Sequence, residues 1–212
     1  MADETISGFL DELAARTPAP GGGAGAALEA AQAAALVAMV ARYSDRPRAA
    51  GHAELIASVL GEADQLRADC FRLITADAEA FGAVAVAYQL AKNTADRKAV
   101  RSAAIAAALI PATRPQAEVI AACTRLLGLA EALRPVANRS VIGDLAAAVA
   151  SIRAAAATGR INIEANLPGI SDRTARARYM EVAAGVEGLL ARADALTAGV
   201  RADLALLLQP RR

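Results

Sequence analysis

Alanine dominates this sequence and limits the folds that are open to it. Sixty of the 212 residues are alanine, aromatic residues make up only 3%, and tryptophan is absent. Alanine is the strongest helix former, whereas strands favour the aromatic side chains that are scarce here. The chain is also long enough to bury a sizeable core. We therefore expect an all-α fold, a bundle of long, partly buried, alanine-rich helices that forms a single domain over residues 1–212.

The charge pattern excludes several classes of partner. The formal net charge is +1, with no basic block, so nucleic acid is not an expected partner. Long uncharged runs such as Ala30–Ala41 fall short of the roughly 20 residues that span a bilayer. We expect a soluble chain with no membrane partner. The acidic N-terminus and the two cysteines, which make no disulfide framework, favour the cytoplasm.

Few residues are available to bind a metal. His52 is the only histidine, and Cys70 and Cys123 are isolated from each other in the sequence. One chain cannot assemble a conventional zinc, haem or iron–sulfur site from these three residues. A nucleophilic triad would need His52, whose neighbours give no support. We expect no metal and no prosthetic group, so any catalysis would depend on carboxylates, amides, hydroxyls and helix termini.

Helical periodicity and helix-breaking residues predict six helices. They cover residues 4–15, 26–43, 48–90, 94–133, 141–167 and about 172–208. The second is nearly all apolar, which indicates a buried central helix. Pro111 and Pro115 are expected to kink or split the fourth. Asn138 or Ser140 is expected to cap the fifth helix, and Ser171 or Asp172 the sixth.

Asp77 lies inside an apolar stripe of the third predicted helix. Spacings of three and four residues join Leu66, Cys70, Leu73, Asp77, Phe81, Val84 and Tyr88. Burial disfavours the ionised carboxylate and raises its pKa, which suits a general acid or base near neutral pH. A salt bridge to one of the 21 arginines is an equally good explanation. Function is favoured if Asp144 faces the same cleft.

The fifth predicted helix carries a face of small residues with one acid and two amides. Its members are Asp144, Ala148, Ser151, Ala155, Gly159, Asn162 and Asn166. If the helix is continuous, this face predicts the wall of a groove rather than a core stripe. Asn162 and Asn166, one turn apart, could bind a heterocycle or cap a neighbouring helix.

Three glycines, Gly21–Gly23, follow Pro18 and Pro20 and open the second predicted helix. Free N–H groups at a helix N-terminus favour anionic or carbonyl-bearing ligands. A sharp turn with tight helix packing explains the glycines equally well. No strand precedes them, which excludes a dinucleotide-binding unit. Lys92 and Asn93 end the third predicted helix, where a solvated C-cap is the ordinary explanation.

Taken together, these residues make the sequence resemble the cyclodeaminase/cyclohydrolase family, which includes the C-terminal domain of formimidoyltransferase-cyclodeaminase and free-standing methenyltetrahydrofolate cyclohydrolases. The resemblance covers nearly the whole chain. Its motifs are Glu4-Thr-Ile-x-x-Phe9-Leu-Asp-Glu-Leu-Ala14, Pro18-x-Pro20-Gly-Gly-Gly23, Ala35-Leu-Val-Ala-Met39, Asp77-Ala-Glu-Ala-Phe81, Lys92-Asn93-Thr94, Asn138 ahead of Val141-x-x-Asp144, and Ile161-Asn-Ile-x-x-Asn166.

The resemblance implies a helical homodimer that acts on a one-carbon-substituted tetrahydrofolate without a metal. Cyclohydrolases add water to the 5,10-methenyl ring to give 10-formyltetrahydrofolate, and cyclodeaminases close the ring of 5-formimidoyltetrahydrofolate with loss of ammonia. We prefer the cyclohydrolase because the chain stands alone. Asp77 would be the acid/base group, and Asp144 would orient or stabilise the cationic substrate. The residues assigned to substrate binding are Pro20, Gly21, Gly22, Gly23, Lys92, Asn93, Asn162 and Asn166.

The sequence departs from the family pattern at two single positions and in the stretch Ser44-Asp45-Arg46-Pro47-Arg48, which replaces a lysine-rich stretch often seen after the central helix. Many relatives carry Ser or Gly where Ala24 stands, and Ser where Gly143 stands. Loss of these hydroxyls would weaken hydrogen bonding to the substrate. A non-catalytic folate-binding or structural helical protein is therefore a third interpretation, beside the cyclohydrolase and the cyclodeaminase.

Overall fold

The computed structural model describes residues 5–46 and 51–207. These residues form helices and turns without a strand, so the expected all-α fold is confirmed. The α-helices are α1 (Ile6–Ala14), α2 (Gly22–Ser44), α3 (Ala53–Gln89), α4 (Ala95–Leu133), α5 (Ile142–Asn166) and α6 (Arg173–Leu207). Short 3₁₀ turns within the described residues include η2 (Arg134–Val136), η3 (Arg139–Val141) and η4 (Leu167–Gly169). The expected start of the third helix at Arg48 and the expected end of the last at Leu208 lie outside the described residues.

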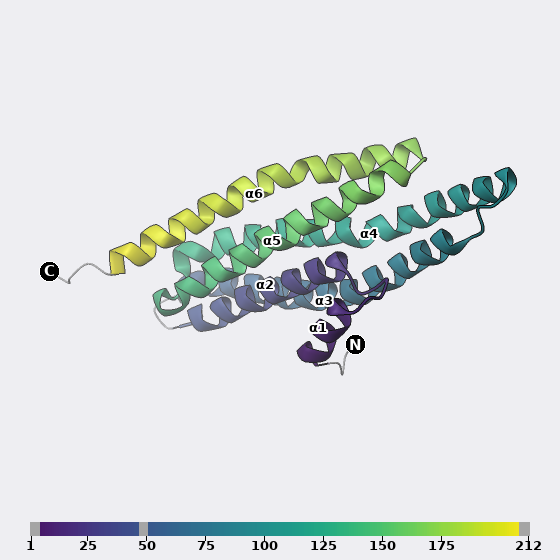
Figure 1. The fold of residues 1–212 in the computed structure, drawn as a ribbon. Helices are drawn as coiled ribbons and strands as arrows, with labels where there is room; N and C mark the ends of the chain where they lie inside the picture. The colour runs from purple at the N-terminus through teal and green to yellow at the C-terminus, as the bar shows by residue number, and fades with distance from the viewer. Residues whose placement is uncertain (1–4, 47–50, 208–212) are drawn as a thin grey trace.

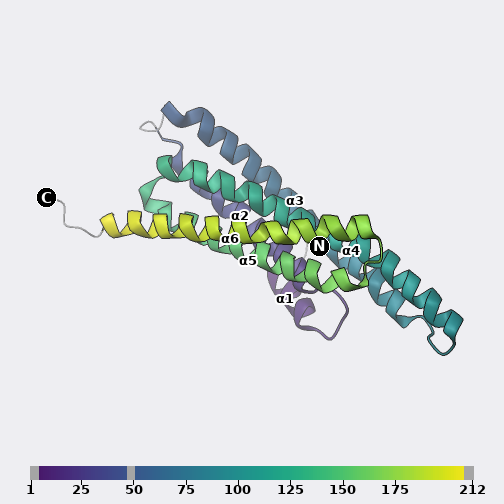
Figure 2. The ribbon, with the colours of Figure 1, turned by 90° about the horizontal axis from the view of Figure 1, so that it is seen from above.

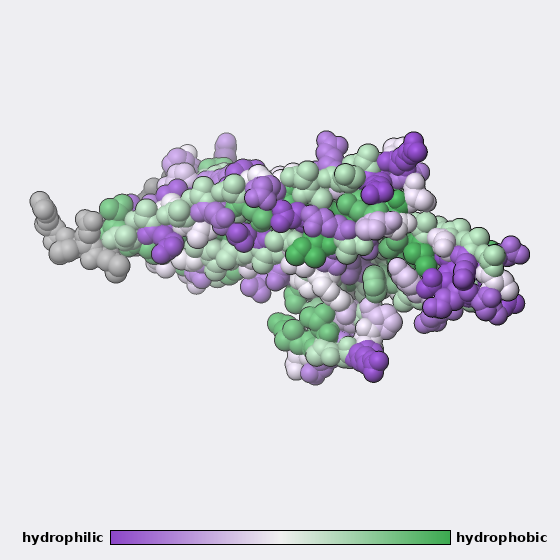
Figure 3. Space-filling model, turned by 45° about the horizontal axis from the view of Figure 1, so that its top comes forward, coloured by the Kyte–Doolittle hydropathy of each residue, from purple (hydrophilic) through white to green (hydrophobic). Residues whose placement is uncertain are grey.

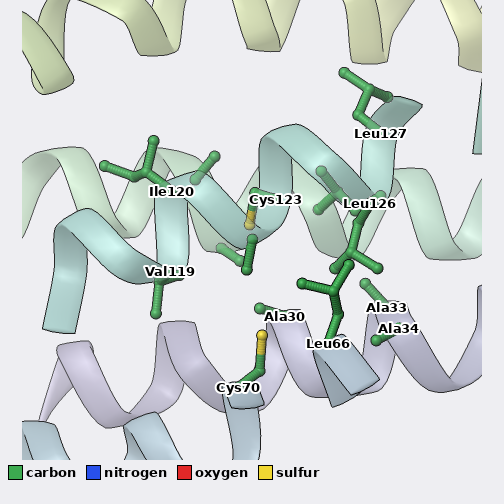
Figure 4. Packing of buried hydrophobic residues seen from close by; sticks show 14 of the residues in the cluster. Ala30, Ala33, Ala34, Leu66, Cys70, Val119, Ile120, Cys123, Leu126 and Leu127 are labelled. Atoms are coloured by element: carbon green, nitrogen blue, oxygen red, sulfur yellow. The ribbon is translucent and has the colours of Figure 1, made fainter. Parts of the chain in front are cut away.

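Helix α2 is the centre of an elongated bundle (Figures 1 and 2). It packs against α3, α4 and α5, and α6 covers α4 and α5 from outside. The alanines of α2 allow this close approach, because a methyl group leaves room for the neighbouring backbones. Figure 4 shows Ala30, Ala33 and Ala34 of α2 below the side chains of α4, with Leu66 and Cys70 of α3 beside them. The expected buried central helix is confirmed.

Two segments are long and apolar enough to cross a membrane by length and composition alone. One is α2, in which 61% of the most apolar window is buried inside the protein, and the other is Arg139–Gly169, in which 39% is buried. The core helix of a water-soluble protein has the same composition. The burial of α2 by three neighbouring helices therefore accounts for its apolar sequence.

Helix α4 does not split at its prolines, contrary to that part of the expectation. It is continuous from Ala95 to Leu133 and contains Pro111 and Pro115. Each proline removes one backbone hydrogen bond of the helix, and packing against α3, α5 and α6 holds the helix together on both sides. The Tyr179 hydroxyl of α6 donates to the Ile110 carbonyl at 3.0 Å, beside Pro111. Tertiary packing thus outweighs the local cost of the two prolines.

Capping follows the sequence at α6 but not at α5. Asp172 accepts a hydrogen bond from the backbone N–H of Ala175 at 2.7 Å, as expected of a cap. Asn138 instead caps the 3₁₀ turn η3, where its side chain accepts from the Ser140 N–H. The N-cap position of α5 is Val141, which makes no side-chain cap hydrogen bond.

Two parts of the chain project from the bundle. The distal halves of α3 and α4 form a two-helix arm, and α1 lies to one side of α2 (Figures 1 and 2). The arm explains why the apolar stripe of α3 is buried from Leu66 to Asp77, whereas Phe81 and Tyr88 are 41% and 53% exposed. In Figure 3 hydrophobic residues gather on the segment that projects below the bundle, where α1 exposes Ile6 and Leu10.

A candidate active site around Asp77

Asp77 lies where α3 meets the first turn of α2 and the middle of α4. Its side chain is buried, with the residue only 8% exposed. The Gln116 Nε2 atom donates to Asp77 Oδ1 at 2.6 Å, and the Ala24 N–H donates to the carboxylate as well. Within the described residues no arginine, lysine or histidine pairs with it. The alternative of an interhelical salt bridge is therefore wrong.

The carboxylate of Asp77 supplies the cap that the sequence of α2 lacks. The N-cap residue of α2 is Gly21, which has no side chain to accept the free N–H groups of the first turn. Asp77 reaches these groups from α3, and the missing side chain of Gly23 makes room for it. A Cβ atom on Gly23 would fall under 3.0 Å from both Asp77 oxygens and from Gln116 Nε2. Of the three glycines, Gly23 is thus the one that the close approach between these helices requires.

Burial and hydrogen bonding act on Asp77 in opposite directions. Desolvation is the largest effect and raises the pKa of the Asp77 carboxyl, because the ionised form loses its contact with water. The hydrogen bonds from Gln116 and from the Ala24 N–H stabilise the ionised form and lower the pKa in part. The net shift is upward. A carboxyl group with a raised pKa can exchange protons closer to neutral pH than an exposed aspartate.

Two amides of α5 complete the polar surroundings of this junction. Asn162 lies beside Gly22, whose Cβ, if present, would be 3.6 Å from Asn162 Nδ2. The Asn162 Nδ2 atom donates to the Thr158 carbonyl of its own helix, so Oδ1 stays available. Asn166 Nδ2 donates to Thr113 Oγ1 of α4 at 3.2 Å, one turn before Gln116. Four helices therefore bring polar groups to one end of the α2 axis.

Three of the predicted site residues lie elsewhere in the chain. Asp144 is in the first turn of α5, about 27 Å along that helix from Asn162. Lys92 and Asn93 are exposed at the tip of the arm, beyond about 18 Å of helix after Asp77. Asn93 accepts a hydrogen bond from Arg97 there. The expected shared cleft of Asp77 and Asp144 is wrong within one chain, because residues that share one face of a helix can still lie many turns apart.

The glycines and small residues that the sequence motifs singled out differ in how closely they approach Asp77. Gly23 is buried against Asp77, whereas nothing lies within 4 Å of the Cβ direction of Gly21. Pro20 is half-buried just before them. Ala24 is buried and acts through its backbone N–H, so a hydroxyl at this position is not needed for that contact. Gly143 is exposed at the start of α5, far from Asp77.

The small-residue face of α5 is mostly core rather than a groove wall. The helix is continuous, as that prediction required. Ala148 and Ala155 are fully buried, however, and Gly159 packs against Ile120 and the Gln116 carbonyl of α4. Asp144, Ser151 and the two amides of this face are only half-buried. Small residues here serve close helix packing.

Sequence reasoning missed Gln116, Thr113 and Glu29. Gln116 and Thr113 are 1% and 0% exposed. Thr113, Gln116, Ile120, Cys123 and Leu127 are joined by spacings of three and four residues, the signal that singled out Asp77. Glu29 is the one acidic residue in the apolar sequence of α2. Both signals were present in the sequence as polar residues on apolar helical faces.

Glu29 gives a prediction about stability. Its Oε2 atom is buried without a hydrogen-bond partner, and desolvation raises the pKa of the Glu29 carboxyl. Because the folded-state pKa lies above the unfolded one, the contribution of Glu29 to stability is present at low pH and is lost as the pH rises through the folded-state value. Glu29→Gln removes the ionised form, so we expect its melting temperature at pH 8 to exceed that of the wild type by about 1–3 °C.

Thermal unfolding between pH 4 and pH 8 would test this expectation. The advantage of Glu29→Gln should shrink as the pH falls. The matched control is Glu79→Gln, since Glu79 is exposed on α3 and its replacement should leave the melting temperature unchanged. A Glu29→Gln protein that melts at the wild-type temperature at every pH would contradict the desolvation argument.

The described surface is hollowed in several places away from Asp77, and two of these hollows lie between helices of the bundle. A cavity of about 450 Å³ lies at the opposite end of the bundle, where Arg134 pairs with Asp203 at 2.9 Å. A second, of about 400 Å³, lies between α3 and α4 and is lined by Leu66 and Arg125, among others. Neither contains a predicted site residue. Within the described residues no group of three or more histidine, cysteine or acidic residues is placed to bind a metal ion.

Comparison with known proteins agrees with the helical fold. Residues 5–185 match the model of the formiminotransferase-cyclodeaminase family. The chain is 39% identical over 196 residues to the methenyltetrahydrofolate cyclohydrolase of Methylorubrum extorquens. The matched region covers 92% of this chain and 92% of that enzyme. The chain is 29% identical to the formimidoyltransferase-cyclodeaminase of Mus musculus. The matched region covers 81% of this chain and 32% of the mouse enzyme.

A solved structure has the same fold. The crystal structure of formiminotetrahydrofolate cyclodeaminase from Thermotoga maritima matches with a TM-score of 0.80 and 26% identity, over 94% of this chain and 98% of that one. The family model, the relatives and the fold thus agree with the resemblance in the sequence motifs. This chain belongs to the formiminotransferase-cyclodeaminase family.

Proposed function

We propose that this protein is a methenyltetrahydrofolate cyclohydrolase that converts 5,10-methenyltetrahydrofolate and water to 10-formyltetrahydrofolate. The observation that carries the proposal is Asp77, a buried carboxyl group with a raised pKa and no paired cation. The 39% identical relative from Methylorubrum extorquens, which matches over nearly the full length of both chains, supports hydrolysis as the reaction. Asp77 is the catalytic residue in this proposal.

The reaction needs one group that accepts and returns a proton. Asp77 takes a proton from a water molecule as the oxygen of that water bonds to the methenyl carbon. This addition neutralises the cationic ring. The tetrahedral carbon then opens: its bond to N5 breaks, Asp77 returns the proton to N5, and the new hydroxyl loses its proton to solvent as the formyl group forms. One proton is released in total. The same carboxyl group serves both steps because its raised pKa keeps the two protonation states close in energy.

The surroundings of Asp77 fit the binding of a flat polar heterocycle. Gly21 and Gly22 present backbone without side chains, and the Asn162 oxygen faces this side of α2. A pterin ring carries N–H donors and carbonyl acceptors along its edges, which backbone and amide groups can match. We assign Pro20 and Asn166 to the rim of this site. Asp144, Lys92 and Asn93 have no role in it within one chain.

Turnover of 5,10-methenyltetrahydrofolate by the purified protein is the direct test. We expect its absorbance to be lost faster than in buffer alone, with 10-formyltetrahydrofolate as the product. A second candidate is the cyclodeaminase, favoured by the fold shared with the Thermotoga maritima enzyme. Ammonia release from 5-formimidoyltetrahydrofolate, without methenyl hydrolysis, would select it. Binding of a folate without turnover of either substrate would select a non-catalytic folate-binding protein.

We also propose that the protein is a cytoplasmic homodimer in which the arms of α3 and α4 pack against a second copy. The arm exposes apolar side chains that a monomer would leave in water, and α1 adds Ile6 and Leu10. Those of the arm are Phe81, Val86, Tyr88, Leu90 and Val100.

Light scattering gives the measurement for the dimer. We expect about twice the chain mass of 21.6 kDa. A double variant, Val86→Glu with Val100→Glu, places charges on residues that are 63% and 64% exposed in one chain, and it should shift the protein to monomer. The control is Glu181→Lys, a change at an exposed residue of α6, which should leave the mass measured by light scattering unchanged. A wild-type protein that is monomeric at micromolar concentration would contradict this proposal.

A further inference from the structure

Gln116 is a fully buried amide that is hydrogen-bonded through its nitrogen but not through its oxygen. The residue is 1% exposed, and its Nε2 atom donates to Asp77 Oδ1 at 2.6 Å. Its Oε1 atom is buried, and no described residue donates a hydrogen bond to it. Buried polar atoms in proteins are nearly always paired, so an acceptor left free beside a carboxyl group needs an explanation.

A primary amide can satisfy a carboxyl group in either of its protonation states. An ionised carboxylate only accepts hydrogen bonds, and it needs the NH₂ of the amide. A protonated carboxyl group carries an O–H donor, and it needs the amide oxygen. Rotation of the amide by half a turn about its last side-chain bond exchanges the two ends. Because no other group holds the Oε1 end of Gln116, this rotation breaks no other hydrogen bond.

We infer that Gln116 is a positioning residue that matches both protonation states of Asp77, donating through Nε2 to the carboxylate and accepting through Oε1 from the carboxylic acid. The inference rests on the proposed function, in which Asp77 takes up a proton from water and returns it to N5. No proton is exchanged with the amide itself. Its role is to keep a buried partner for Asp77 throughout the cycle.

The other neighbours of Asp77 cannot take this role. On α2, the Ala24 N–H only donates. On α5, Asn162 and Asn166 donate to Thr158 and Thr113, and neither of them is hydrogen-bonded to Asp77, unlike Gln116. The charged residues around these positions are Glu29 on α2, Glu79 on α3, the exposed pair Arg114 and Glu118 on α4, and Arg160 and Glu164 on α5, and none of them contributes to the shift in the pKa of Asp77. Uncharged groups therefore control the ionisation of Asp77.

The inference predicts how Gln116→Met changes the pH dependence of catalysis. Methionine has a similar volume but offers neither end of the amide. Gln116 stabilises both forms of Asp77, but its hydrogen bond to the ionised carboxylate is stronger than one made with the neutral acid, so its loss should still raise the pKa of Asp77. We expect the acid limb of the kcat/KM profile to move to higher pH by about one unit, so that kcat/KM at any pH on that limb falls about tenfold while KM changes less than twofold.

Two additional measurements separate this role from a structural one. Gln116→Glu can still fill the space, but two neighbouring carboxyl groups share one proton, so its acid limb should move to higher pH still. Glu118→Gln, a change on an exposed residue of the same helix, should keep the wild-type profile. Thermal unfolding establishes that each variant folds. A lower kcat with an unmoved acid limb would overturn the inference, since loss of packing has no preferred pH.

The pKa of Asp77 can also be followed without a substrate. Carbon NMR of the labelled side-chain carboxyl group should show titration at higher pH in Gln116→Met than in the wild type. If the wild-type protein does not turn over 5,10-methenyltetrahydrofolate, the proposed function fails while this titration still decides the role of Gln116. An Asp77 titration that is identical in the two proteins would overturn the inference, whatever the substrate proves to be.

Discussion

Asp77→Asn is expected to lower kcat for hydrolysis of 5,10-methenyltetrahydrofolate by about 10²–10⁴-fold, the usual contribution of one general acid–base group. The asparagine oxygen still accepts the Ala24 N–H and still caps α2, since asparagine and aspartate are equally good caps. The amide cannot take a proton from water. The variant should therefore keep its melting temperature within a few degrees of the wild type while losing turnover.

Steady-state kinetics and thermal unfolding of the same preparation give the measurement. Glu79→Gln is the matched control, because this exposed acid lies two residues away on α3 and should retain full activity. A folded Asp77→Asn protein with wild-type turnover would remove the acid–base assignment. Asp77 would then be only the cap of α2 and the partner of Gln116.

The pH dependence of the wild-type enzyme follows from the same residue. Desolvation raises the pKa of Asp77, and the group must be ionised to accept a proton from water. Activity should therefore increase with pH through this raised pKa, and its acid limb should lie above that of an exposed aspartate. The Asp77→Asn variant should lack this limb.

The sequence predicted the helices well because they follow from local rules. The apolar run of α2 and the spacing that buries Asp77 need only the period of a helix, and both are confirmed. Proline is also a local signal, but its effect in α4 is decided by neighbouring helices. The uninterrupted helix through Pro111 and Pro115 could not be predicted without knowing what packs on them.

The site could be predicted only in part, because periodicity gives the face of each helix but does not give which turns of neighbouring helices lie side by side. Asp77 and Asn162 meet the first turn of α2, while Asp144 shares a face with Asn162 but lies five turns away. Gln116 carried the same signal as Asp77, a polar residue on an apolar face. The need of a buried carboxyl group for a partner becomes evident only when α3 and α4 are placed side by side.

Gly23→Ala is expected to be the most damaging small substitution in the chain. A methyl group there would fall under 3.0 Å from both oxygens of Asp77 and from the Gln116 amide. All three atoms are buried, so the carboxyl group, the amide or the start of α2 would have to move. We expect a loss of stability of about 1–3 kcal/mol, the usual cost of overpacking a core. We also expect kcat to fall at least tenfold, because Asp77 would lose its present hydrogen bonds.

Urea unfolding and kinetics of Gly23→Ala, beside Gly25→Ala, separate the contact from the general effect of replacing glycine. Gly25 lies two residues further along α2 and has nothing within 4 Å of its Cβ direction. Alanine there favours the helix, so Gly25→Ala should be neutral or should gain up to about 1 kcal/mol. If both variants behaved alike, the close contact of Asp77 with the Gly23 backbone would not be needed. The triple glycine would then serve only the turn that precedes α2.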